Sequence, residues 1–360
     1  MKTAFLKRDT NIVKGIAIIF LLIHHCFLSP GRYKNIEVSF APFTESQVGY
    51  IAAFLKICVG MFVFLTAFGI TISLKNRYGS LNFTGTQAKT YTLHRLKNLF
   101  TGWIFVFVLC EVFCMVYSGL PMEIYGANAK GIIRFLLDGL GVANLFGTPT
   151  LLGTWWYMSL AITLIFVIPV LIFAYRNIGF WYLAGLFVIL SRQLHMTDVS
   201  LIHWTPAVLL GIACADKGWL VKMSNYQLIK KSETLNKIIK LILGIAVLCA
   251  MVKFRQSGMS AVLFEIKDGV IPFFIIYFCY EFICGIPIVS TALEFIGKYS
   301  MNIFLTHTLI RATYFRKFIY GFYYAPLIVI VLLVISLAVA VAIELLKKIS
   351  GYNLLKKKVL

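Results

Sequence analysis

The sequence predicts an all-α polytopic integral membrane protein, and three observations support that prediction. Hydrophobic residues make up 60% of the 360 residues and charged residues only 13%, whereas about a quarter of the residues in soluble globular domains are charged. The mean hydropathy is +0.87. The apolar residues are gathered into runs long enough to cross a bilayer. So few charges could not cover a water-facing surface of this size, and the bilayer is the expected solvent.

The apolar runs divide the chain into a bundle of about ten expected transmembrane helices. A span needs about 20 mostly apolar residues, and runs of this kind recur along the whole chain. The fifth and sixth are short and are expected to be tilted or re-entrant. The expected spans are 10–29, 48–73, 97–118, 153–175, 178–191, 200–215, 236–254, 268–286, 301–319 and 324–346.

The Lys and Arg residues indicate how the chain is oriented. The net charge is +20, but the positive residues lie in short segments between the apolar runs, which favours topology signals over nucleic-acid binding. If both termini are cytoplasmic, the inside segments hold about twice as many Lys and Arg as the outside segments. We therefore expect one multi-pass membrane domain over residues 1–360, with a short lysine-rich cytoplasmic tail at 350–360. The expected location is the bacterial cytoplasmic membrane.

Cysteine usage and the N-terminus add two further expectations. The eight cysteines lie singly, without a Cys-x-x-Cys pair, and nearly all are in apolar runs, where a thiol acts as a small hydrophobe. We expect no metal site, no bound cofactor and no required disulfide. The basic N-terminus and the apolar run after it are similar to a signal peptide. The run is as long as a full span and no small-residue cleavage site follows it, so a retained first helix is expected.

The first expected span, KGIAIIFLLIHH, carries three ionisable residues, Lys14, His24 and His25. A helix turns about 100° and rises about 1.5 Å per residue, so Lys14 and His25 face the same way about 16 Å apart, while His24 points about 80° aside. Ionisable groups inside a span are costly and indicate a functional site. Two alternatives stay open: Lys14 could extend to the headgroups, and His24 could make a helix–helix hydrogen bond.

This stretch resembles the first-helix motif of the membrane acyltransferase 3 family, a basic residue followed by ten residues and a histidine. Later stretches resemble that family in the same order: VGMFVFLTAFGITIS (59–73), HRLKNLF (94–100), WWYMSLAITLIFVIP (155–169), TPAVLLGIACAD (205–216) and GKYSMNIFLTHTLI (297–310). Four positions depart from the pattern. Lys14 replaces the commoner arginine, Asn11 and Ala161 stand where acids are common, and Asn98 thins the basic stretch. Which acid supports the histidine is left open.

The resemblance implies transfer of an acyl group, usually acetyl from acetyl-CoA as co-substrate, to a hydroxyl of an envelope polysaccharide or its lipid-linked precursor. His25 would be the general base or would briefly carry the acyl group. A positioned neutral imidazole typically contributes about 10²- to 10⁴-fold. Lys14, Arg95 and Lys97 would hold the phosphates of the donor, and Lys14 could instead polarise the thioester oxygen.

Four further polar or aromatic residues are candidates for supporting roles. Glu111 lies in an apolar run and would pair with a basic group or orient a histidine. His307 and Arg311 stand four apart, share a helix face and could contact the acceptor near the outer end of their span. Trp156 begins the expected fourth span, where it could anchor at the interface or stack on a sugar.

A polytopic transporter or flippase for a lipid-linked glycan or small solute is the alternative from another class. Such proteins also use rare intramembrane charges, but they often show paired halves with broken helices in matching positions. No such repeat is visible in this sequence. The expected partners are acetyl-CoA, the glycan acceptor and the lipid bilayer, without nucleic acid, and a homo-oligomer stays open.

Overall fold

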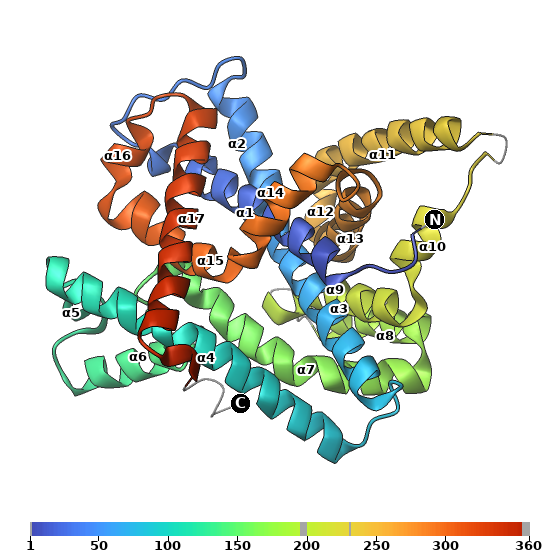
Figure 1. Cartoon of the computed structure of the whole chain (residues 1–360), viewed down its shortest axis with the longest axis horizontal. Helices are drawn as coiled ribbons and strands as arrows, with labels where there is room; N and C mark the ends of the chain where they lie inside the picture. The colour runs from blue at the N-terminus through green and yellow to red at the C-terminus, as the bar shows by residue number, and fades with distance from the viewer. Residues whose placement is uncertain (1, 195–199, 230–231, 355–360) are drawn as a thin grey trace. The chain divides into compact units, whose positions relative to one another are not determined.

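A computed structural model describes residues 2–194, 200–229 and 232–354 of the chain. Within these residues the secondary structure is helical and contains no strand, apart from an isolated β-bridge between Ser39 and Tyr324 (Figure 1). The predicted all-α fold is confirmed. The end of the expected lysine-rich tail, residues 355–360, lies outside the described part.

Six helices in the described part of the chain are long and apolar enough to cross a membrane. They coincide with the first, second, third, fourth, seventh and tenth expected spans, and the count of ten is not confirmed. The other four expected spans fall on shorter helices or on helices interrupted by π-helical turns. The six are Lys7–Phe27, Glu45–Tyr78, Gly85–Ser118, Gly153–Ile178, Glu233–Arg255 and Ala325–Ile349.

The chain divides into two compact units, which are described one at a time. Unit 1 comprises residues 1–32, 42–81 and 170–298, and unit 2 comprises 33–41, 82–169 and 299–360. The helices of unit 1 are α1 (Lys7–Phe27), α2 (Glu45–Phe54), α3 (Cys58–Tyr78), α8 (Phe180–Gln193), α9 (Ser200–Lys217), α10 (Trp219–Asn225), α11 (Glu233–Arg255), α12 (Met259–Val262), α13 (Ile271–Phe278) and α14 (Pro287–Lys298), with the shorter turns η1 (Pro30–Arg32), η2 (Leu55–Ile57), η5 (Ile266–Val270) and η6 (Cys279–Ile283).

Unit 2 is built from fewer elements, of which α4 and α17 are long. They are α4 (Gly85–Ser118), α5 (Leu120–Tyr125), α6 (Ala129–Gly139), α15 (Ser300–Thr308), α16 (Arg316–Tyr320) and α17 (Ala325–Ile349), with the turns η3 (Ala143–Phe146), η4 (Gly153–Trp155) and η7 (Leu309–Tyr314). Helix α7 (Trp156–Ile178) begins in unit 2, and the boundary between the units follows Pro169 inside it. A proline within a helix removes one backbone hydrogen bond.

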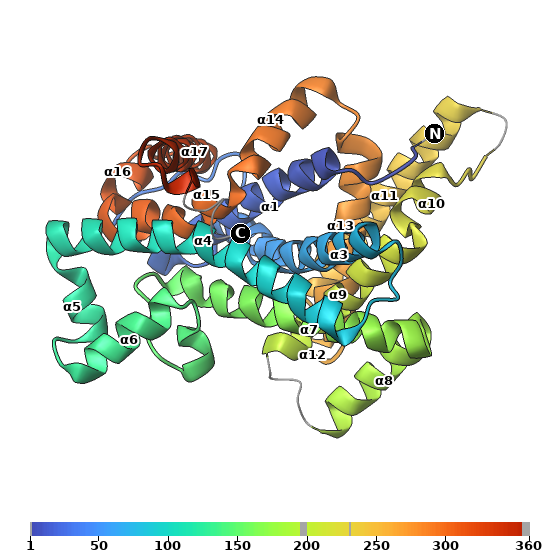
Figure 2. The same cartoon turned by 60° about the horizontal axis from the view of Figure 1, so that its bottom comes forward.

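Glycines set the packing of unit 1. Helix α1 lies along α14 (Figure 2). A Cβ atom at Gly15 would lie 2.2 Å from the carbonyl oxygen of Leu293, and one at Gly297 would lie 1.8 Å from that of Asn11. Small residues allow such close approach of two helix backbones in a membrane. The helix that carries Lys14 and His25 is therefore positioned by direct backbone contact.

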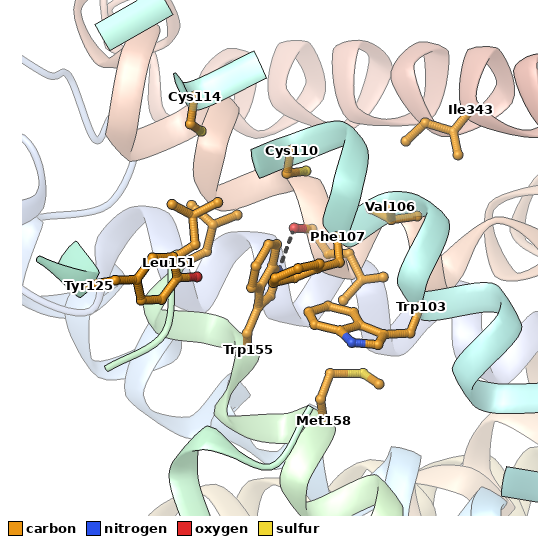
Figure 3. Packing of buried hydrophobic residues seen from close by; sticks show 12 residues of the cluster. Trp103, Val106, Phe107, Cys110, Cys114, Tyr125, Leu151, Trp155, Met158 and Ile343 are labelled. Atoms are coloured by element: carbon orange, nitrogen blue, oxygen red, sulfur yellow. Dashed lines mark hydrogen bonds between the residues drawn. The ribbon is translucent and has the colours of Figure 1, made fainter. Parts of the chain in front are cut away.

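Aromatic side chains set the packing of unit 2. The rings of Trp103, Phe107 and Trp155 gather in one buried cluster (Figure 3), and the two tryptophan rings meet edge to face with centroids 4.7 Å apart. The Trp103 indole N–H donates to the Gly139 carbonyl at 2.8 Å, and that of Trp155 donates to the Leu305 carbonyl at 3.0 Å. The cluster thereby joins α4, α6, α15 and the start of α7.

Two hydrogen bonds show which ends of the unit 2 helices lie together. The Tyr352 hydroxyl, just after α17, donates to the Thr101 carbonyl in the middle of α4 at 2.7 Å. At the far end of α4, the hydroxyls of Ser118 and Tyr314 lie 2.6 Å apart. The last turn of α17 carries two lysines, which favours a cytoplasmic location for that end. Ser118 and η7 lie at the other end of unit 2.

Candidate functional site

The residues that the sequence singles out fall in both units. Lys14, His24 and His25 belong to unit 1. Unit 2 holds the others, which are Arg95, Lys97, Glu111, Trp156, His307 and Arg311. Helix α1 runs without interruption from Lys7 to Phe27, so the same-face geometry expected for Lys14 and His25 applies. Both of these side chains are half-buried.

His24 is held by a neighbouring helix. Its side chain is buried, and its Nδ1 lies 2.7 Å from the Ala52 carbonyl oxygen on α2. A carbonyl oxygen can only accept, so Nδ1 carries the proton and donates it. This is the helix–helix hydrogen bond that the sequence left open for His24.

His25 has a different partner. An Nη atom of Arg32 lies 3.3 Å from His25 Nδ1 and 3.2 Å from the His25 carbonyl oxygen. A guanidinium can only donate, so Nδ1 is the nitrogen with the lone pair and the neutral ring carries its proton on Nε2. Of the two adjacent histidines, His24 therefore donates a hydrogen bond from Nδ1 and His25 accepts one at Nδ1.

Sequence reasoning missed Arg32. The residue is brought back to His25 by η1, the turn Pro30–Arg32 that follows the end of α1. The available signal was the Pro-Gly pair directly after the helix, because such pairs mark turns and a turn there returns the next side chain to the helix end.

The basic residues of α4 point to different sides. Arg95 is half-buried and Lys97 is exposed, and two residues along a helix correspond to about 200° of rotation. Arg95 shares its face with Tyr91, four residues earlier. The Tyr91 hydroxyl is buried and has no hydrogen-bond partner among the residues that the structure describes. The polar face at this end of α4 therefore combines Arg95 with Tyr91 rather than with Lys97.

Glu111 pairs with a phenol. The Tyr125 hydroxyl oxygen lies 2.6 Å from Glu111 Oε1 and 2.6 Å from Asp138 Oδ2, and Asp138 Oδ2 also accepts from the Leu151 backbone N–H at 2.8 Å. A phenol has one proton, so both short contacts are hydrogen bonds only when one carboxyl group is protonated. Burial raises the pKa of Asp138 to about 6. Burial and the two carboxylates raise the pKa of Tyr125.

An apolar cavity of about 400 Å³ lies beside Glu111. Apart from Glu111 and the ring of Tyr125, its walls are apolar side chains and glycines from α4, α5, α6 and the turn between α5 and α6. They include Met115, Met122 and Phe135. In unit 2, Glu111 thus forms part of a carboxyl–phenol–carboxyl group at the wall of an apolar cavity.

His307 and Arg311 are both buried. His307 Nδ1 lies 2.8 Å from the Phe304 carbonyl oxygen, so Nδ1 carries the proton, and the Thr308 hydroxyl lies 3.3 Å from Nε2. Helix α15 ends at Thr308, and Arg311 lies on the π-helical turn η7. The four-residue spacing therefore crosses from an α-helix into a wider turn, a rare element often found at functional sites.

The two tryptophans that start the fourth expected span differ. Trp155 is buried in the aromatic cluster, whereas Trp156 is half-buried and packs edge to face against Tyr157, with ring centroids 5.9 Å apart. Stacking of Trp156 on a sugar stays a prediction.

Comparison with known protein families matches residues 8–345 to a family described as an acyltransferase domain. No curated protein and no solved structure matches the chain. The matched range covers nearly the whole chain and includes both units, with Lys14, His25, Arg95 and Arg311 inside it.

Proposed function

We propose that this chain, which belongs to the membrane acyltransferase family whose domain spans residues 8–345, transfers an acetyl group from acetyl-CoA to a hydroxyl of an envelope polysaccharide or its lipid-linked precursor. Membership supplies the acyltransferase activity, and the several long apolar helices make the protein a multi-pass membrane protein. The donor, the acceptor and the residue roles below are the proposal.

The observation that supports it most directly is the lone pair on His25 Nδ1. An Nη atom of Arg32 lies 3.3 Å from this atom, and because a guanidinium can only donate, the contact is a hydrogen bond when Nδ1 is the unprotonated nitrogen. A sugar hydroxyl is a poor nucleophile at neutral pH, and a positioned neutral imidazole can remove its proton as attack proceeds. His24 has its lone pair on Nε2 instead, because its Nδ1 proton is donated to the Ala52 carbonyl, and its side chain is buried, whereas that of His25 is half-buried.

In the proposed step the acceptor hydroxyl takes the place of Arg32 at His25 Nδ1. The hydroxyl oxygen attacks the thioester carbonyl carbon, and its proton passes to Nδ1. The C–S bond then breaks, and the thiolate takes the proton from the imidazolium and leaves as CoA. Arg32, displaced from Nδ1 but still beside it, donates to the oxyanion that forms on the carbonyl oxygen, a form of stabilisation that contributes strongly in acyl transfer.

The donor is assigned to cationic groups toward the cytoplasmic side. Lys14 lies on the same face of α1 as His25 and about 16 Å from it, a distance comparable to an extended pantetheine arm. In unit 2, Arg95 and the buried Tyr91 hydroxyl share one face of α4, and phosphate oxygens would satisfy both. Lys97, exposed on another side of the helix, would contribute charge rather than a directed hydrogen bond.

The test measures alkali-labile acetate on purified surface glycan. Three strains are compared: the gene deleted, the wild type restored, and His25→Ala restored at matched protein level. We expect only the wild type to restore the acetate. Equal acetate in all three strains, with glycan export changed instead, would show that the protein is a transporter and that the proposal is wrong.

A further inference from the structure

Among the residues that the structure describes, the buried cationic side chains are almost all paired with a carboxylate. In unit 1, Arg255 lies 3.2 Å from Asp268 and Lys240 lies 3.3 Å from Glu281. In unit 2, Lys347 lies 2.7 Å from Glu344. This is the expected arrangement, because an uncompensated buried charge costs several kcal/mol.

Arg311 is the exception within the described residues. Arg311 is only 5% exposed. No carboxylate among the described residues lies within ion-pair distance of its guanidinium. Its Nε is buried and has no hydrogen-bond acceptor among the described residues. Its one hydrogen bond to a residue that the structure describes is long, 3.4 Å from an Nη atom to the Tyr320 hydroxyl. Arginine stays protonated in proteins, so the guanidinium presents a charge and an unused donor that only an anion can satisfy together.

Arg311 also lies at a defined end of unit 2. It is on η7, three residues before Tyr314, whose hydroxyl meets Ser118 at the C-terminal end of α4. The two lysines in the last turn of α17 mark the other end as cytoplasmic. The phosphates of a cytoplasmic donor therefore reach Arg95 rather than Arg311, and an anion at Arg311 comes from the outer side.

We propose that Arg311, with the Tyr320 hydroxyl, binds a phosphate group of the lipid-linked acceptor on the outer side of unit 2. This assignment rests on the proposed function, in which a lipid-linked glycan is acetylated. Guanidinium groups bind phosphate oxygens through paired N–H donors, and Nε with one Nη forms such a pair. The π-helical turn places this side chain beside the Tyr320 hydroxyl, 3.4 Å from an Nη atom.

The apolar cavity supports a lipid as the carrier of the phosphate. Met115 and Val116, in its wall, lie within one turn of Ser118, the residue that meets Tyr314. Large apolar side chains of the surrounding α4 and α6 surface, including Val112 and Ile132, are exposed and so face hydrocarbon. A hydrocarbon chain beside α4 and a phosphate at Arg311 would therefore be at the same end of unit 2.

The first test needs no acyl transfer, so its failure and that of the proposed function can be told apart. The purified full chain is titrated with inorganic diphosphate in detergent, without acetyl-CoA, and the midpoint of thermal unfolding is followed. Every protein compared carries Arg95→Gln, which removes phosphate binding at the proposed donor site, and "wild type" refers to residue 311. We expect diphosphate to raise the midpoint of the wild type. Arg311→Gln should weaken diphosphate binding about ten- to hundredfold, the usual loss for hydrogen bonds to a charged group. Lys317→Gln, which removes an exposed charge six residues away, should bind as the wild type does.

The variant without ligand provides a second readout. Removal of an unpaired buried charge should leave the midpoint of Arg311→Gln at or above that of the wild type, whereas a structural arginine would lower it. Arg311→Lys keeps the charge without the fork and should bind with intermediate affinity. Diphosphate binding that is equal in Arg311→Gln and the wild type, or absent from the wild type, would overturn the site.

The source of the phosphate is then tested in lipid nanodiscs of neutral phosphatidylcholine. Polyprenyl diphosphate or phosphatidylglycerol is added at equal phosphate content. We expect polyprenyl diphosphate to raise the unfolding midpoint of the wild type more than phosphatidylglycerol does, and the difference to vanish in Arg311→Gln. Equal effects of the two lipids would overturn the assignment to a lipid-linked acceptor.

Discussion

The helices inside unit 1 and those inside unit 2 pack by different means. In unit 1, backbones meet where side chains are missing, as at Gly15 against Leu293 and at Gly297 against Asn11. In unit 2, α4, α6, η4 and α15 are joined by the large rings of Trp103 and Trp155 and by their indole hydrogen bonds. Unit 1 should therefore be most sensitive to added volume and unit 2 to lost volume.

The contrast matters for function because the proposed residues depend on different kinds of packing. His25 and Lys14 are residues of α1, and the position of α1 against α14 is fixed by backbone contact. Arg311 follows α15, which receives the indole hydrogen bond of Trp155. A substitution that loosens unit 2 should thus disturb the anion site proposed at Arg311, whereas a methyl group added between α1 and α14 should displace the proposed base.

The largest effect is expected from Trp155→Ala in unit 2. Truncating a fully buried tryptophan costs about 3–5 kcal/mol, and this one is 1% exposed and also loses its hydrogen bond to the Leu305 carbonyl. The free energy of unfolding in mixed detergent micelles measures the cost. Trp156→Ala is the matched control, because Trp156 is half-buried and should cost clearly less. Equal costs would show that the aromatic cluster does not hold unit 2 together.

The next effect is expected from Gly297→Ala in unit 1. The added Cβ would lie 1.8 Å from the Asn11 carbonyl oxygen, so α1 and α14 must separate. Overpacking of this kind costs about 1–3 kcal/mol, and transfer activity should fall with it because α1 carries His25.

The control for Gly297→Ala is Gly69→Ala, at a helical glycine with nothing within 4 Å of a new Cβ. It should be neutral or stabilising by up to about 1 kcal/mol. If both variants unfold at the same detergent concentration, backbone contact does not limit the packing of unit 1.

A third prediction concerns the pH dependence of unit 2. Burial raises the pKa of Asp138 from 3.8 to about 6, so the folded state holds this proton more tightly than the unfolded chain. The stabilisation from protonation is then full below the ordinary aspartate pKa and is lost as pH rises through about 6. From pH 5 to pH 8 the wild type should lose about 1–3 kcal/mol through this group.

The variant Asp138→Asn isolates that contribution. Its amide oxygen, in the position of Oδ2, can still accept from both the Leu151 N–H and the Tyr125 hydroxyl. The free energies of unfolding of the two proteins should therefore converge near pH 5 and separate in favour of the variant near pH 8. A constant difference across this range would show that Asp138 does not titrate on folding.

The sequence predicted those features that depend on local pattern. The long apolar runs predicted the six long helices, and the spacing from Lys14 to His25 predicted a shared face, because α1 has no interruption. The expected ninth span was less predictable. Its helix α15 gives way to the π-helical turn η7, and the change from one backbone hydrogen-bond pattern to another leaves no mark in composition.

The hydrogen-bond partners of the candidate residues could not be predicted from the sequence for a related reason. Arg32 reaches His25 only through the turn after α1, and Glu111 meets Asp138 only through Tyr125. These contacts arise from turns and tertiary packing, which hydropathy and periodicity do not encode. The isolated position of Arg311 could not be predicted either, because a buried charge is known to lack a partner only when its neighbours are known.

The smallest effect on stability, and the sharpest test of the two histidines, is expected from His24→Phe. The ring is kept, but the hydrogen bond from Nδ1 to the Ala52 carbonyl is lost, which should cost about 1 kcal/mol. Acetyl transfer should survive at matched protein level, because the lone pair proposed as the base is on His25. His25→Phe should abolish transfer. The free energy of unfolding should change little, because the hydrogen bond that is lost, from Arg32 to His25 Nδ1, is long at 3.3 Å. Loss of transfer in His24→Phe with transfer retained in His25→Phe would assign the base to His24 and reverse the roles that these hydrogen bonds imply.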